Sequence, residues 1–229
     1  MIQKDLCNYI TSEFSDYLEP ISLLSKSTEG KVLVKDERKL YNFDKITEKV
    51  YNNLKVPSSA DALFATSKEL LFTEFKSGFK RKISEETIDY NKLTCPDDNT
   101  KICKDYAKLL IDKGKFETKE LLDSLKFKAI ESFVTLEKKL FAFCPGSVPE
   151  NKHIKVIFCV VIDDYIDSME DTLTELADKP SASNTLTNVR ASLSRFVGLK
   201  TSDGQDYFYD EIKVLSPYEY TQYINRFTT

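Results

Sequence analysis

Three charged residues stand inside a stretch that otherwise reads as two apolar strands around a turn. In "DALFATSKELLFTEFKSG", residues 61–78, Asp61 opens the first strand, and Glu74 and Lys76 close the second. Charged side chains in buried strands are costly unless they are paired, solvated or bound to a metal. The pattern therefore indicates a site, and carboxylates beside a lysine are suited to holding a divalent cation and a phosphate group.

Strand geometry predicts which of these side chains meet. Glu74 and Lys76 are two residues apart, so both point to the same face of the sheet. We expect the turn to place Asp61 opposite Phe72, which makes Asp61 and Glu74 diagonal neighbours with Cα atoms roughly 7–8 Å apart. A slip of one residue would send Asp61 to the other face, so the prediction depends on the register of the hairpin.

Two carboxylates at that separation can share one divalent cation. The chain has a single histidine, and oxygen ligands without histidine favour Mg²⁺ or Mn²⁺ over zinc. Such a metal polarises a phosphate and lowers the pKa of a bound water, while a lysine can orient that water. We therefore expect Asp61 and Glu74 to be metal ligands and Lys76 to be a catalytic residue in phosphodiester hydrolysis.

An alternative interpretation gives these charged residues a structural role and no site. Charges on strands usually belong to a solvated strand end with a cross-strand ion pair. Against that, the residues around Glu74 and Lys76 are mostly apolar on both faces, which favours a central strand and a site. For Asp61 alone, an acid at a turn or strand edge explains the sequence equally well.

The elements that must position these residues follow from the apolar periodicity of the chain. The predicted elements are helices at 3–18, 42–54, 117–141, 168–179 and 185–197, a buried strand at 153–162, a strand at 206–215 and a helix at 216–227. Residues 84–115 read as a loop-rich insertion with short helical pieces at 85–92 and 102–112. This order predicts an α/β fold with a mixed central sheet, in which an antiparallel hairpin is flanked by helices and later strands are reached by helical crossovers.

The hairpin resembles the core motif of the PD-(D/E)XK nuclease superfamily, which has the restriction-endonuclease-like fold. In "SADALF…LLFTEFKSG", Asp61 corresponds to the motif aspartate, and Glu74 and Lys76 correspond to the E-x-K. The proline of the motif's name is not adjacent, because Ala60 precedes the aspartate and Pro57 lies four residues before it. The resemblance implies a restriction-endonuclease-like core and a metal-dependent nuclease.

The resemblance covers roughly residues 42–162 and implies further site residues. Members of the superfamily often place another metal-site acid on the helix before the hairpin, where Glu48 is the best candidate. The helix after the hairpin, "SLKFKAIESFVTL", brings Lys128 toward the sheet, where a lysine would assist phosphate binding or metal hydration. The competing interpretations are an exposed helix acid for Glu48 and, for Lys128, a solvated face with an ion pair to Glu131.

A basic run leaves the second strand directly. Lys80, Arg81 and Lys82 follow within residues 75–82, where no acid intervenes, and we expect them to bind a nucleic-acid backbone. DNA rather than RNA is the substrate that the family analogy implies. A solvated loop is the alternative interpretation of this run.

Length and composition predict one domain over residues 1–229. Its core spans about 42–162, with the insertion at 84–115, an N-terminal helical extension at 1–40 and a C-terminal strand and helix at 206–227. No apolar run approaches the length of about 20 residues that spans a bilayer. The N-terminus lacks an apolar signal core, so we expect a cytoplasmic protein without a membrane partner.

The formal net charge of −4 argues against a protein whose whole surface attracts nucleic acid, but it permits a local basic patch. It also keeps a second function open. The alternative is a catalytically silent nuclease-fold protein that binds a protein partner in an immunity or defence system. The sequence does not indicate the oligomeric state.

Overall fold

The computed structural model describes residues 2–52, 54–77, 100–144, 154–162, 189–195, 197–200, 202, 204 and 208–226. The chain divides into two compact units, of which the first comprises Met1–Phe79 and Leu125–Thr229 and the second comprises Lys80–Ser124. The second unit includes the segment that the sequence set apart as an insertion. The first unit contains the sheet and every site residue described below.

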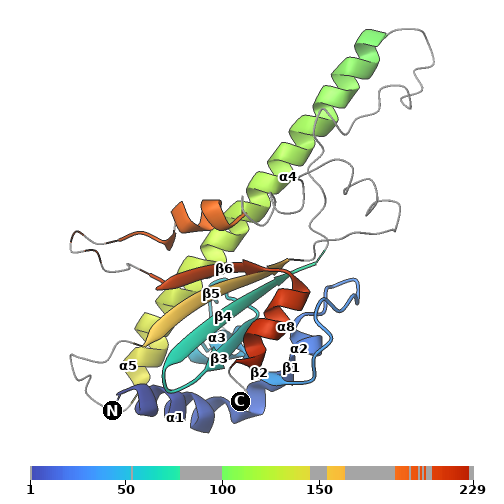
Figure 1. Cartoon of the computed structure of the whole chain (residues 1–229). Helices are drawn as coiled ribbons and strands as arrows, with labels where there is room; N and C mark the ends of the chain where they lie inside the picture. Colours follow the sequence, from blue (N-terminus) through green and yellow to red (C-terminus); the bar gives the residue numbers. More distant parts are fainter. Residues whose placement is uncertain are drawn as a thin grey trace. The chain divides into compact units, whose positions relative to one another are not determined.

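A mixed sheet of six strands forms the centre of the first unit (Figure 1). Its strands, in spatial order, are β1 (Leu18–Pro20), β2 (Lys39–Asn42), β3 (Ala62–Ala65), β4 (Glu69–Lys76), β5 (Lys155–Ile162) and β6 (Glu211–Leu215). Strands β1 to β4 pair antiparallel, and β5 and β6 continue the sheet in parallel. The predicted α/β class, with a mixed sheet built on an antiparallel hairpin, is confirmed.

Strands β1 and β2 are absent from the sequence prediction. The segment 1–40, expected to be a helical extension, contributes β1 and the first residues of β2 to the sheet. These strands have three and four residues, so neither is long enough to show an alternation of apolar and polar side chains. They extend the sheet beyond β3, which makes β3 an internal strand.

The helices are α1 (Ile2–Phe14), η1 (Ser15–Tyr17), α2 (Ile21–Leu24), α3 (Phe43–Val50), α4 (Thr100–Thr135), the π-helical turn η4 (Leu136–Leu140), α5 (Phe141–Phe143) and α8 (Pro217–Asn225). Residues 189–195 and 197 are also helical. Helix α3 begins after Asn42, whose side chain accepts a hydrogen bond from the N–H of Lys45. Ser216 and Glu219 form a capping box at the start of α8, which begins where the sequence predicts the C-terminal helix. No helix in the part of the chain described is long and apolar enough to cross a membrane.

Helix α4 corrects one part of the prediction. It begins at Thr100, so the helical piece expected at 102–112 is present but is continuous with the long helix, and the expected break before 117 does not occur. Leu109 and Phe116, two of its apolar residues, are exposed to solvent. The helical piece expected at 85–92 lies outside the described residues.

Apolar side chains cover both faces of the sheet. On one face, Tyr220 and Ile224 of α8 pack with Leu71 and Phe75 of β4 in a continuous buried cluster. On the other face, Phe72 contacts Phe43 of α3, and the Tyr209 hydroxyl donates a hydrogen bond to the Ala129 carbonyl of α4 at 2.5 Å. Glu74 shares this second face with Phe72, so its carboxylate points toward α3 and α4 rather than toward α8.

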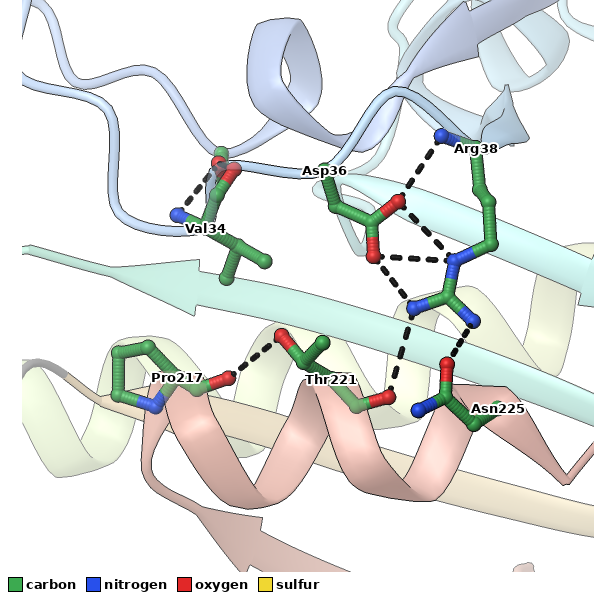
Figure 2. A network of polar contacts seen from close by, with 7 residues as sticks. Val34, Asp36, Arg38, Pro217, Thr221 and Asn225 are labelled. Carbon is green, nitrogen blue, oxygen red and sulfur yellow. Dashed lines mark hydrogen bonds and ion pairs between the residues drawn. The ribbon is translucent and has the colours of Figure 1, made fainter.

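A polar network fastens α8 to the segment before β2 (Figure 2). Nε of Arg38 donates to the Asp36 carboxylate at 3.0 Å, and Nη1 donates to Asn225 Oδ1 at 2.7 Å. Nη2 reaches the carbonyl oxygen of Thr221 at 3.4 Å. The guanidinium thus joins the N-terminal segment to two positions of the C-terminal helix.

Candidate active site

The hairpin brings Asp61 to the level of Glu74. Leu63 pairs with Phe72 in the antiparallel β3–β4 ladder, and continuing this register by two residues sets Asp61 across from Glu74. The expected register, with Asp61 opposite Phe72, is therefore wrong by two residues. A shift of two residues preserves the face on which each side chain lies, so Asp61 and Glu74 still meet, as direct rather than diagonal neighbours.

The turn explains this shift. The N–H of Thr66 donates to the carbonyl of Glu69 at 2.9 Å, so the ladder reaches this pair and the loop consists of Ser67 and Lys68. The Thr66 hydroxyl also accepts hydrogen bonds from the N–H groups of Lys68 and Glu69 at 3.2 and 2.9 Å. A threonine that holds a tight turn through its side chain is difficult to distinguish by sequence from one in a longer loop.

Asp61 is held by the neighbouring strand. Its Oδ2 accepts a hydrogen bond from the backbone N–H of Phe75 at 2.6 Å, and its Oδ1 lies 3.2 Å from Nζ of Lys128. The side chain keeps 21% of its surface exposed. One oxygen is thus committed to the sheet, while the other faces the charged cluster.

Glu74 is the buried centre of the cluster, with a side chain that is 0% exposed. Its Oε1 lies 2.8 Å from the ammonium nitrogens of both Lys76 and Lys128, and its Oε2 accepts a hydrogen bond from Lys128 at 2.9 Å. Neither ammonium meets Oε1 with hydrogen-bond geometry, and no other described residue does so. One carboxylate oxygen is therefore enclosed, close to positive charge, and without a directed hydrogen bond.

The electrostatics follow from this burial. Burial and the nearby Asp61 charge raise the pKa of Glu74 to about 7, although the two lysines oppose the rise. Burial works against the charged form of Lys128, but the carboxylates of Glu74 and Asp61 outweigh it, so the pKa of Lys128 is raised. Lys128 is therefore charged at neutral pH, and Glu74 titrates within the physiological range.

Helix α4 positions Lys128. Leu125 and Ala129 are buried on either side of it along the helix, which directs this face of α4 to the sheet. The helix is tied to the segment before Asp61, because the Ala60 N–H donates to Ser132 Oγ at 2.8 Å. The sequence predicted Lys128 as a site residue, and the structure brings it together with Asp61, Glu74 and Lys76.

Glu131 has a different contact from the ion pair with Lys128 that the alternative interpretation expected. Its carboxylate accepts a hydrogen bond from the Ser58 N–H at 2.5 Å, rather than serving as the ion-pair partner of Lys128. Glu131 and Ser132 together anchor the strand approach at residues 58–60. These contacts make α4 a positioning element for Asp61 as well as the source of Lys128.

The structure does not bring Glu48 into the cluster. Glu48 is exposed, and no hydrogen bond or ion pair joins it to the cluster within the described ranges. Asp44, one turn earlier on α3, lies closer: its carboxylate accepts a hydrogen bond from the Ser59 hydroxyl. Asp44 is also exposed as a residue, but partial desolvation of its carboxylate raises its pKa, and the charges of Asp61 and Lys128 act on it.

Sequence reasoning missed Asp44, although a signal existed. Asp44 and Glu48 are four residues apart, so they lie on the same side of the helix. Which of the two acids lies beside the cluster depends on which turn of α3 is next to the sheet. Phe43 N–H donates to the Asp61 carbonyl at 3.2 Å, which sets the first turn of α3 beside the site. That contact follows from β2, which the sequence did not reveal.

The predicted nucleic-acid residues Lys80, Arg81 and Lys82 lie outside the described residues. Their predicted role stays a prediction. The part of the basic run that the structure describes ends at residue 77, so Lys76 is its contribution to the cluster.

The donor set of the cluster fits a hard divalent cation. Asp61 and Glu74 supply carboxylate oxygens, and the Glu74 Oε1 that lacks a directed hydrogen bond is an enclosed oxygen suited to a cation. Within the described ranges, no three histidine, cysteine or acidic side chains gather into a metal-binding group. Lys128 contacts both of these carboxylates, so a cation held between them would meet this lysine.

No protein-family model, curated protein or solved structure matches this chain. The chemistry of the site has to be argued from its residues.

Proposed function

We propose that this chain is a metal-dependent nuclease that hydrolyses phosphodiester bonds, with DNA rather than RNA as the expected substrate. One observation carries the proposal: Asp61 and Glu74 from the hairpin meet Lys76 and Lys128 at one position on the sheet. The other three side chains are 21–24% exposed around a Glu74 that is fully buried. Two carboxylates and two ammonium groups, open to solvent on one side, suit a phosphodiester and its metal.

Each residue has a distinct role in this proposal. Asp61 and Glu74 hold Mg²⁺ or Mn²⁺, which when bound polarises the phosphate and lowers the pKa of a bound water. Lys76 orients the attacking water and stabilises charge on the phosphate, because its ammonium lies at Glu74 and retains exposure. Asp44 and Ser59 support the site from the side of α3.

We also propose that the fold is restriction-endonuclease-like. The order of α3, the β3–β4 hairpin, α4 and a parallel β5 supports this, because it follows the α-β-β-β-α-β order of that core, with two rather than three strands described between the helices. The position of the D-x₁₂-E-x-K residues on the hairpin supports it as well. DNA as substrate rests on the family analogy, and Lys80, Arg81 and Lys82 are proposed to bind its backbone.

The test is cleavage of supercoiled DNA, linear DNA and RNA in Mg²⁺, Mn²⁺ or EDTA. We expect metal-dependent cleavage that is lost by at least a hundredfold in Asp61→Asn, Glu74→Gln and Lys76→Ala. The matched control is Glu211→Gln on β6. Glu211 also pairs with two lysines, Lys155 of β5 and Lys213 of β6. Cleavage that survives the site variants, or that disappears equally in the control, would contradict the assignment.

A second function has its own supporting observation. Lys128 and Lys76 already neutralise both carboxylates without a metal, as they would in a nuclease-fold protein that has become a binding partner. That protein would bind a partner of an immunity or defence system. It would cut none of the substrates, bind no Mn²⁺ in calorimetry, and retain a protein partner in pull-down experiments whether or not Glu74 is replaced by glutamine.

A further inference from the structure

We propose that Lys128 is a built-in cation, which a divalent metal has to displace from Asp61 and Glu74, so that this lysine sets the metal affinity of the site. This inference rests on the proposed function, because it concerns how that function's metal enters. It assigns Lys128 to regulation of the site rather than to binding of the phosphate.

The contacts of Lys128 carry the inference. Its Nζ lies 2.8 Å from Oε1 of Glu74, 2.9 Å from Oε2 of Glu74 and 3.2 Å from Oδ1 of Asp61. One ammonium thus bridges the two carboxylates that a metal would use. Among the described residues, Lys128 is also the one cation paired with Asp61.

Lys76 does not play this part. Its ammonium contacts Oε1 of Glu74 at 2.8 Å, and the described ion pairs give it no contact with Asp61. A cation shared by both carboxylates therefore competes with Lys128 at Asp61 and at Glu74. The cation competes with Lys76 only for Oε1 of Glu74. Lys128 therefore opposes metal binding at both carboxylates, and Lys76 opposes it at one.

The side chain of Lys128 has room and a second partner. It is 21% exposed, and an ammonium on a four-carbon stem can reorient without moving the helix. The carboxylate of Asp44 acts electrostatically on Lys128 and lies on the neighbouring α3. We expect the displaced ammonium to pair with Asp44, which would give that carboxylate a function the sequence did not suggest.

The main experiment is Mn²⁺ calorimetry on the full chain at a fixed pH of 7.5. We expect Lys128→Met to bind Mn²⁺ at least tenfold more tightly than the wild type, and Lys76→Met to gain less. The matched control is Lys155→Met, which removes a lysine from the Glu211 bridge and should leave the affinity unchanged. Equal or weaker Mn²⁺ binding by Lys128→Met, with circular dichroism unchanged, would overturn the inference.

A second measurement needs no destabilising variant. Lysine side chains labelled with ¹³C at Cε report their surroundings by NMR, and Lys128→Arg assigns the resonance of interest. Adding Mg²⁺ to the wild type should move the Lys128 resonance and leave that of Lys155 in place. A Lys128 resonance that does not respond at saturating Mg²⁺ would overturn displacement, even if Lys128→Met fails to fold.

The outcomes separate this inference from the proposed function. Tighter Mn²⁺ binding by Lys128→Met without cleavage by any form would support the displacement and reject the nuclease. Metal-dependent cleavage with unchanged Mn²⁺ affinity in Lys128→Met would support the nuclease and reject the displacement. Absence of both cleavage and Mn²⁺ binding, in the wild type and in Lys128→Met, would reject both.

Discussion

At the scale of single residues, Glu74 stands out as the one charged side chain that is buried among the described residues. Its carboxylate is fully enclosed, and its pKa is raised to about 7 because burial and Asp61 outweigh two adjacent lysines. A group whose charged form is disfavoured in the native state lowers the stability of the fold when it ionises. Such residues are typical of sites selected for chemistry rather than for stability.

The pH dependence of stability tests this directly. Between the unfolded pKa of about 4.5 and the folded value of about 7, the native state binds more protons, so the contribution of Glu74 is present below this range and is lost as pH rises through it. Glu74→Gln removes the effect. The unfolding free energy of the variant relative to wild type should therefore improve by about 2 kcal/mol from pH 5 to pH 8, measured by urea denaturation.

Glu211→Gln is the control for this comparison. Burial also disfavours the charge of Glu211, but hydrogen bonds from Lys155 and Lys213 prevail and lower its pKa. Its stabilising contribution is present above the unfolded value and is lost only in more acidic solution. The effect of Glu211→Gln should hence be the same at pH 5 and pH 8. A similar change in both variants would show that the buried position of Glu74 is not the cause.

Ser132 illustrates a positioning residue that can be tested against a close neighbour. Its hydroxyl accepts the buried Ala60 N–H, so Ser132→Ala leaves that N–H without a partner, at a cost of about 1–3 kcal/mol, and loosens the approach to Asp61. Thr135, also buried on α4, has a hydroxyl with no hydrogen bond to the described residues. Thr135→Val should be neutral or stabilising in the same denaturation experiment.

Mn²⁺ affinity is a second measurement that distinguishes Ser132→Ala from Thr135→Val. Ser132→Ala should weaken Mn²⁺ binding, because Asp61 loses its fixed approach, whereas Thr135→Val should leave it unchanged. If both variants lose the same stability and neither alters Mn²⁺ affinity, the contact between Ser132 and Ala60 has no role in positioning Asp61.

At the scale of elements, the sequence predicted the parity of the hairpin better than its register. Alternation along β4 places Glu74 and Lys76 on one face whatever the loop length, because the side-chain period is two residues. The register depends on one threonine side chain in the turn, and no periodic signal reports it. The prediction of neighbouring carboxylates therefore survived an error in their pairing.

The elements that the sequence missed share a physical cause. Strands β1 and β2 have three and four residues, which is too short to show alternation, and Leu109 and Phe116 in the first part of α4 are exposed. Strands β1 and β2 form through pairing with each other and with β3, and the first part of α4 continues the long helix. Asp44 was overlooked for the same reason, because β2 sets where α3 begins.

Helix α8 is an element whose docking can be tested without touching the site. Arg38→Ala removes hydrogen bonds to Asn225 and Thr221, so we expect a loss of about 1–3 kcal/mol and faster amide exchange within α8. Mn²⁺ affinity should stay unchanged, since α8 covers the face opposite Glu74. Lys45→Ala, which breaks an ion pair between Glu19 and an exposed lysine, is the control and should change stability far less than Arg38→Ala.

At the scale of the whole molecule, a net charge of −4 means that binding to nucleic acid would have to rely on a local patch. Replacing Lys80, Arg81 and Lys82 by glutamine should reduce the slope of log affinity for DNA against log salt by roughly 3, about one for each lost phosphate contact. Fluorescence anisotropy over a range of NaCl measures this slope. An unchanged slope would assign the basic run to a solvated loop.

The hydrogen bond between Phe75 and Asp61 has a consequence for the thermodynamics of any ion that enters the site. Because the 2.6 Å contact already holds Asp61 and enclosure already holds Glu74, the two carboxylate side chains would lose little rotamer freedom if an ion bound. The conformational entropy of these two side chains was lost when the chain folded. Selectivity would then come from preorganisation: a rigid pair of oxygens accepts an ion of matching size and cannot relax around a larger one.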